Sequence, residues 1–181
     1  MGKKILVVNG SPRKNGNTAR MIKAFAEASE AKGNTVVEFN AALSNIGGCH
    51  ACETCYKSGK PCTYDDDFNT VAPDFLEADA IVFAAPTYWY SFPGQIKNAI
   101  DKCYSFAIGQ KPIGGKDVAL IACCEEKDPA VMDGLSLPFD RIAALLKWNI
   151  VGKVLVPGVL HEGDVDKTDG CSQAAALAEK F

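Results

Sequence analysis

The chain has 181 residues, of which 48% are hydrophobic and 23% charged, and this composition excludes a disordered or collagen-like chain. No apolar run reaches the roughly 18 residues of a membrane-spanning helix, so we expect neither membrane insertion nor a secretion signal. The 19 Lys and Arg residues are scattered and the net charge is −3, which predicts no nucleic-acid partner. We expect one domain over residues 1–181.

Eight cysteines are present. Because no secretion signal accompanies them, we expect a reducing cytoplasmic location, in which clustered cysteines indicate metal or redox chemistry rather than disulfides.

Apolar runs of strand length alternate along the chain with segments of helical period. We expect strands at 5–8, 35–39, 80–84, 118–122 and 151–156. Helices are expected before the stop signal Gly33, after the acidic run 65–67, from Pro93 onward, and around 139–146. This alternation predicts an α/β fold, a doubly wound three-layer sandwich whose five-stranded parallel sheet has the order 2-1-3-4-5. Ligands of such a sheet bind at the carboxyl ends of the strands.

The loop at residues 10–18 follows the first strand and leads directly into the first helix. The Ser11 and Thr18 hydroxyls, the Asn17 amide, the Arg13 guanidinium and free backbone N–H groups can converge there on a phosphate. The alternative is a plain polar turn. Because Asn17 stands where a Walker loop has its lysine, and the G-x-G-x-x-G pattern is absent, the loop favours a terminal monophosphate.

The loop at residues 86–94 follows the third strand and reads PTYWYSFPG, with three consecutive aromatic residues. Aromatic faces and backbone N–H groups at the end of a central strand suit a flat conjugated ring. Alternatively, Trp89, Tyr90 and Phe92 pack a subunit interface or cap the sheet.

The loop at about residues 45–64 carries the spacing C-x2-C-x2-C-x6-C, formed by Cys49, Cys52, Cys55 and Cys62. Four thiolates within fourteen residues can surround one metal centre, and this spacing suits an iron-sulfur cubane better than zinc. A cysteine-rich interface loop without metal is the alternative. Since the loop follows the second strand, we expect it at the carboxyl edge of the sheet, beside the ligand.

The remaining candidates have structural interpretations. Cys103 and Cys123 are expected to be buried small hydrophobes, and Cys171 lies in a polar C-terminal stretch. The carboxylates at 65–67 are expected to cap a helix, and His161 to form a solvated pair with Glu162.

Taken together, the motifs are G-S-P-R-x-x-G-N-T after the first strand, then C-x-x-C-x-x-C, D-D, and P-x-Y-W before G-Q-I-K-x-x-I-D. With them the sequence resembles the flavodoxin-like NAD(P)H-dependent FMN reductase superfamily, and within it the iron-sulfur flavoprotein branch. The motifs cover about residues 4–104, and the rest agrees by fold pattern.

The resemblance implies a role for each motif. It makes Ser11, Arg13, Asn17 and Thr18 ligands of the FMN phosphate. It places Pro86, Thr87, Tyr88 and Trp89 beside the isoalloxazine, and it makes Cys49, Cys52, Cys55 and Cys62 ligands of a four-iron, four-sulfur cluster. The loop from Cys123 to Glu126 is a weaker third candidate, where adjacent cysteines depart from the small residues common in the family.

We therefore expect an FMN-dependent oxidoreductase that passes electrons from NAD(P)H or another donor to a quinone, flavin or metal-centred acceptor. The flavin performs the redox chemistry, so no catalytic acid, base or nucleophile is assigned. The redox partner is a small molecule or a protein, and the resemblance implies a homodimer or homotetramer. A non-enzymatic electron carrier is the alternative function, although a net charge of −3 is small for that role.

Overall fold

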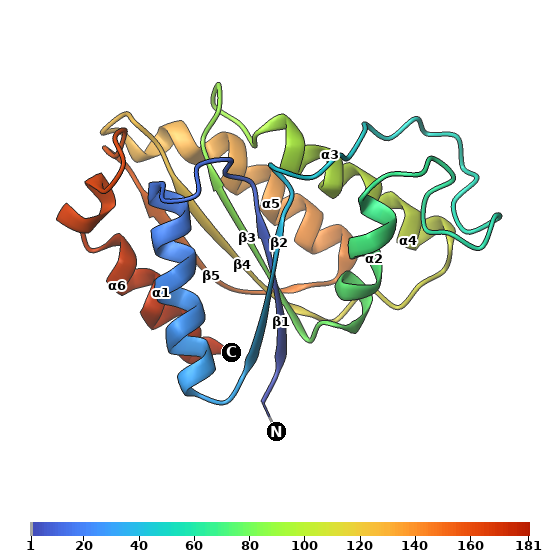
Figure 1. The fold of residues 1–181 in the computed structure, drawn as a ribbon, viewed down its shortest axis with the longest axis horizontal. Coiled ribbons are helices and arrows are strands. Elements are labelled where there is room, and N and C mark those ends of the chain that lie inside the picture. The colour runs from blue at the N-terminus through green and yellow to red at the C-terminus, as the bar shows by residue number, and fades with distance from the viewer. Residues whose placement is uncertain (1) are drawn as a thin grey trace.

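The computed structural model describes residues 2–181 and contains a five-stranded sheet covered by helices on both faces (Figure 1). The strands are β1 (Lys4–Asn9), β2 (Thr35–Asn40), β3 (Ala80–Pro86), β4 (Asp117–Cys123) and β5 (Asn149–Val156). The helices are α1 (Asn17–Ala31), α2 (Phe68–Glu77), α3 (Gly94–Lys102), α4 (Tyr104–Ile108), α5 (Asp133–Leu146) and α6 (Gly170–Leu177). Three short 3-10 helices are η1 (Pro129–Met132), η2 (Asp164–Lys167) and η3 (Ala178–Lys180).

The strand order is β2-β1-β3-β4-β5 and every neighbouring pair is parallel, which confirms the predicted fold class. The central strands β1, β3 and β4 are apolar and almost wholly buried, as strands covered on both faces must be. The edge strand β2 has only exposed and half-buried residues. Parallel register brings the loops after all five strands to one edge of the sheet.

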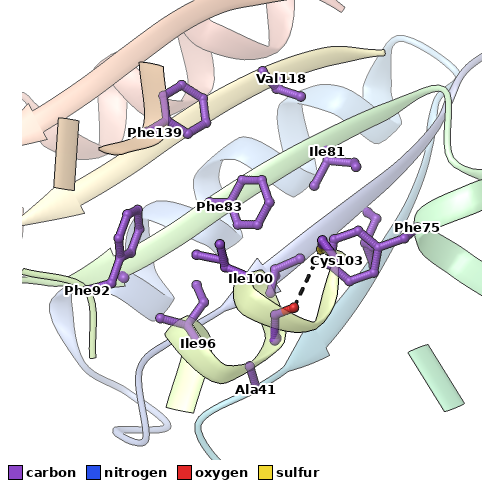
Figure 2. Close-up of a cluster of buried hydrophobic side chains, with 14 of the residues drawn as sticks. Ala41, Phe75, Ile81, Phe83, Phe92, Ile96, Ile100, Cys103, Val118 and Phe139 are labelled. Carbon is purple, nitrogen blue, oxygen red and sulfur yellow. Dashed lines mark hydrogen bonds between the residues drawn. The ribbon is translucent and has the colours of Figure 1, made fainter. Parts of the chain in front are cut away.

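Two separate cores form because successive residues of a strand point to opposite faces. Ile5 and Val7 of β1 pack with α1 and α6, whereas Leu6 and Val8 pack with α2, α3, α4 and α5. Figure 2 shows part of the second core, in which Phe75, Phe83 and Phe139 lie between the helices and the sheet.

Phe92 and Cys103 also belong to this second core (Figure 2). Phe92 is only 6% exposed. It therefore packs over the end of the sheet, which is the alternative to contact with a bound ring. Cys103 is buried and its thiol donates to the Ala99 carbonyl at 3.5 Å, which confirms its interpretation as a small core residue.

Two helices were not expected from the sequence. Helix α6 packs on α1 and β5 through Ala174 and Leu177, and it begins at Gly170, where a β-carbon would crowd Val156. Its alanine-rich face gives little hydrophobic periodicity, so the polar C-terminal stretch that contains Cys171 does not predict this helix. Helix α4 is a single five-residue segment after α3. No helix within residues 2–181 is long and apolar enough to cross a membrane.

Candidate functional site

All eight residues that the sequence singled out for a cofactor line one open cleft of about 340 Å³ at the carboxyl edge of the sheet. The loops after β1 and β3 form two of its walls. The loops after β4 and β5 form the others, through Cys123, Cys124, Glu125, Val159 and Leu160. The cleft therefore lies where the topology predicts a ligand.

The N-terminus of α1 faces this cleft and has no side-chain cap. Its N-cap residue is Gly16, and the backbone N–H groups of Asn17 and Thr18 have no partner within the described part of the chain. The loop before it is folded tightly, because the Asn9 side chain accepts from the Ser11 N–H at 2.8 Å and the Ser11 hydroxyl accepts from the Arg13 N–H at 3.3 Å. Free donors at the positive end of a helix dipole suit an anion.

The Asn17 side-chain amide, expected to bind the phosphate, bonds to other parts of the protein instead. Its nitrogen donates to the His161 carbonyl at 3.0 Å, and its oxygen accepts from the Val165 N–H at 3.2 Å. Both ends of the amide are thus engaged with the segment after β5, and only the backbone N–H of Asn17 remains for a ligand. Sequence spacing located the residue correctly but could not show this tertiary partner.

The segment after β5 forms a cleft wall that the sequence analysis missed. Arg13 donates to the Leu160 carbonyl at 3.2 Å, and Arg20 pairs with Asp166 at 2.7 Å, so two basic residues of the α1 region fasten it. His161 and Glu162 are both exposed, and the backbone of His161 bonds to Asn17 and Asp164. The rule that every loop after a parallel strand reaches the same edge would have pointed to this wall.

Asp164 holds the bend in this segment. Its side chain pairs with Lys167 at 2.9 Å and accepts from the His161 N–H at 2.8 Å and the Leu160 N–H at 3.3 Å. The Lys167 interaction and then these N–H groups lower the pKa of the Asp164 carboxyl to about 2.

The aromatic loop forms a tight turn. Tyr88 and Ser91 exchange two backbone hydrogen bonds of 3.0 Å, and between them Trp89 and Tyr90 have φ values of +46° and +61°. Positive φ at two consecutive bulky residues costs on the order of 1–3 kcal/mol each and is typical of functional sites. Trp89 is 95% exposed, and a β-carbon on Gly134 of α5 would overlap the Tyr90 carbonyl, so the turn is seated firmly on α5.

Thr87 lines the cleft, and its hydroxyl is buried beside it. The Thr87 N–H donates to the Cys123 carbonyl at 2.8 Å, whereas its Oγ1 has no partner in the structure of residues 2–181. An unsatisfied buried hydroxyl costs about 1–3 kcal/mol, so this atom marks a position at which a polar ligand group would be stabilised.

Cys123 and Cys124 line the floor of the cleft but belong to different cores. Cys123 packs with α1, where its sulfur lies 3.5 Å from Thr18 Oγ1, and Cys124 packs on the opposite face. Burial raises the pKa of the Cys123 thiol to about 11, against the opposing effect of the Thr18 contact. Cys123 is thus the buried neutral side chain that the sequence predicted, and the two thiols do not face each other as a dithiol pair.

The four clustered cysteines line a second, much smaller cavity of about 20 Å³, together with Lys102, Tyr104 and Ser105. Cys62 is buried, Cys55 is half-buried, and Cys49 and Cys52 are exposed. Burial, and then the proximity of the other three thiols, raise the pKa of the Cys55 thiol. The fold therefore gathers all four sulfurs around one space.

The position of this second cavity differs from the expectation. The segment after β2 departs from the sheet and extends beside α3 and α4 (Figure 1). No residue lines both cavities, and the cysteines lie at the C-terminal end of α3, whereas the aromatic turn precedes its N-terminal end. At 1.5 Å per residue, the length of α3 is roughly 13 Å.

Side chains at the start of α2 and in the two residues before it accept hydrogen bonds from the cysteine loop. Asp66 accepts from the Gly47 N–H at 2.9 Å, Asp67 from the Asn45 N–H at 2.7 Å, and Asn69 from the Cys62 N–H at 2.7 Å. Of the three carboxylates expected to cap this helix, only that of Asp66 bonds to a backbone N–H at its start, that of Phe68 at 3.1 Å. The others have different partners, so this acidic run serves the loop more than the helix.

The loop backbone has left-handed residues at Ala51, Glu53 and Tyr56, with φ values of +51°, +54° and +60°. Non-glycine residues with positive φ are strained and cluster at functional sites, so the rest of the structure must hold this loop in its conformation.

The arrangement of the four cysteines bears on which metal centre they could hold. Within residues 2–181, no three His, Cys, Asp or Glu side chains stand close enough together to hold one metal ion. In a cubane each thiolate binds a different iron, so the thiolates surround a space instead of converging on a point. Four sulfurs around one cavity fit that requirement, although a space of about 20 Å³ holds only a water molecule and the loop would have to widen.

We predict that Asp164→Asn lowers the free energy of unfolding at pH 7, because the folded state favours the charged carboxylate. The folded pKa of about 2 lies below the ordinary value of about 3.9, so this contribution is complete above that value and is lost as the pH falls towards 2. Urea unfolding at pH 7 and pH 3 measures it, with exposed Glu30→Gln as the control. A difference between wild type and variant that is equal at both pH values would contradict this explanation.

Residues 3–131 match the family described as NADPH-dependent FMN reductase. An iron-sulfur flavoprotein of Archaeoglobus fulgidus is 35% identical over 163 residues, which cover 90% of this chain and 75% of that protein. Another iron-sulfur flavoprotein of the same organism is 27% identical over 188 residues, covering 98% of this chain and 82% of the other. A quinone reductase of Escherichia coli K12 is 33% identical over 127 residues, covering 66% and 60%.

Solved structures give the same picture of the fold. An azoreductase from Bacillus anthracis superposes with a TM-score of 0.72 at 21% identity, covering 99% of this chain and 100% of that chain. A NAD(P)H:quinone oxidoreductase from Methanothermobacter marburgensis gives a TM-score of 0.69 at 12% identity, covering 98% and 96%. At these identities the likeness shows the shared fold alone.

Proposed function

Because this chain belongs to the NADPH-dependent FMN reductase family and is therefore an oxidoreductase, we propose that the 340 Å³ cleft is its FMN site. Electrons pass from NAD(P)H to this flavin and on to a quinone, flavin or metal-centred acceptor. The proposal rests on one observation: two sets of hydrogen-bonding groups without protein partners lie in the walls of the same cleft. The uncapped end of α1 lies in one wall and the buried Thr87 hydroxyl in another.

The α1 end of the cleft would take the FMN phosphate. The backbone N–H groups of Asn17 and Thr18, the Thr18 and Ser11 hydroxyls and the Arg13 guanidinium supply its donors. Arg13 donates to the Leu160 carbonyl, which holds it at the edge of the site. These donors would satisfy a doubly charged terminal phosphate without the lysine of a triphosphate loop.

The segment from Pro86 to Trp89 would border the isoalloxazine. Tyr88 supplies a partly exposed aromatic face, and the Thr87 hydroxyl supplies a donor or acceptor for a polar edge of the ring. When bound, the flavin supplies the redox chemistry. The chain's own residues bind it and exclude water, and the neutral Cys123 thiol fills the floor of the cleft.

The aromatic turn would also be covered by a second copy of the chain. Trp89 is 95% and Tyr90 59% exposed, although the backbone holds both in a strained conformation. Exposed aromatic residues are typical of interface cores, so we propose a homodimer or homotetramer in which the partner closes the flavin cleft.

The four cysteines would hold a four-iron, four-sulfur cluster. Cys49, Cys52, Cys55 and Cys62 line one cavity and would provide one thiolate for each iron. The similarity to proteins named iron-sulfur flavoproteins supports this assignment. Such a centre supplies one-electron chemistry for exchange with an external redox partner.

We predict that Arg13→Ala weakens FMN binding by about 1.5–3 kcal/mol, the contribution of a hydrogen bond to a charged group, or roughly 10- to 150-fold in Kd. Calorimetric titration of the apoprotein with FMN measures this change. Arg141→Ala, at an exposed position on α5, is the control and should bind FMN as wild type does. Unchanged FMN affinity in Arg13→Ala would remove Arg13 from the site.

We predict that anaerobic reconstitution loads the wild-type chain with stoichiometric iron and sulfide, and that Cys62→Ser abolishes this because it removes the buried ligand. Cys171→Ser changes a half-buried cysteine of α6 and should load fully. Iron and sulfide assays with an absorption spectrum provide the measurement. The cluster assignment fails if the wild type takes up no stoichiometric iron.

A further inference from the structure

Two buried polar side chains at the α3–α4 junction face the cysteine cavity. Lys102, the last residue of α3, and Ser105, in the first turn of α4, are each 3% exposed, and both line this cavity. The Lys102 ammonium lies 3.6 Å from the Cys62 sulfur and pairs with the Asp66 carboxylate. The Ser105 hydroxyl has no partner in the part of the chain that the structure describes.

Other protein groups satisfy the hydrogen-bonding capacity of Lys102 and Ser105 only in part. A buried ammonium is unfavourable unless it is paired, and Asp66 provides one partner. However, the same Asp66 oxygen also accepts from the Gly47 N–H, and Lys102 reaches beyond it to the sulfur. Ser105 remains an unsatisfied hydroxyl in a cavity lined by sulfur. Both groups are therefore donors directed at the place where a thiolate-bound centre would sit.

We propose that Lys102 and Ser105 are positioning residues that donate to the sulfurs of the bound cluster and set its reduction potential. This inference rests on the cluster proposed above. Reduction adds one negative charge to a cluster that already carries four thiolates, and a nearby cation and hydroxyl dipole stabilise the reduced form more than the oxidised form. Charge and hydrogen bonds to sulfur are the means by which proteins tune such centres.

A purely structural role for Lys102 is the competing explanation, in which the residue only anchors Asp66 and the loop. That role affects folding and cluster retention but leaves the potential of a loaded cluster unchanged. Lys97 provides a matched control because it lies on the same helix, carries the same charge, and pairs with Asp101 at 2.6 Å on the exposed surface.

The experiment is a redox titration of the reconstituted full chain, followed by the electron paramagnetic resonance signal of the reduced cluster. Lys102→Met should shift the midpoint potential to a more negative value, and Ser105→Ala should shift it in the same direction by less, because a dipole is lost instead of a full charge. Lys97→Met should leave the potential at the wild-type value.

The possible outcomes separate this inference from the proposed function. If the Lys102 and Ser105 variants take up the cluster and its midpoint potential equals that of the wild type, the inference is overturned and the cluster assignment stands. If Lys102→Met fails to load, Ser105→Ala decides the question by the same criterion. A wild-type chain without iron would overturn the cluster itself, and this inference with it.

Discussion

The unsatisfied N-terminus of α1 is the feature on which the larger cleft depends. Because its N-cap residue is Gly16, α1 has no side-chain cap and leaves backbone N–H groups free at the cleft, where the helix dipole adds positive potential. The Asn17 amide does not cap these groups and instead fastens the segment after β5. The same residue thus keeps the anion site open and builds its far wall.

The second cavity depends on a different constraint, which is the anchoring of a long irregular loop to α2 and α3. Asp66, Asp67 and Asn69 accept from its backbone, and Lys102 approaches it from α3. Helix α3 therefore connects the two cavities. The aromatic turn lies just before its first residue, Gly94, and its last residue, Lys102, lines the cysteine cavity. A cluster at one end and a flavin near the other would be separated by protein within one chain.

Sequence patterns predicted the fold because buried parallel strands are short apolar runs, and right-handed crossovers leave few possible orders. They also placed eight residues that meet at one cleft, since the loops after β1 and β3 must share an edge. The sequence did not predict three features, two because they depend on tertiary packing and one because its residues give a weak pattern. The Asn17 amide is taken by a segment distant in sequence, the small residues of α6 give no clear helical period, and the cysteine loop runs away from the sheet along α3.

The central claim is that the uncapped end of α1 binds the phosphate of FMN. The most direct test compares FMN with riboflavin, which lacks only the phosphate, in calorimetric titrations of the apoprotein at fixed ionic strength. We predict that FMN binds at least about tenfold more tightly, because each hydrogen bond to a charged group contributes about 1.5–3 kcal/mol. Equal affinities for the two flavins would contradict the account.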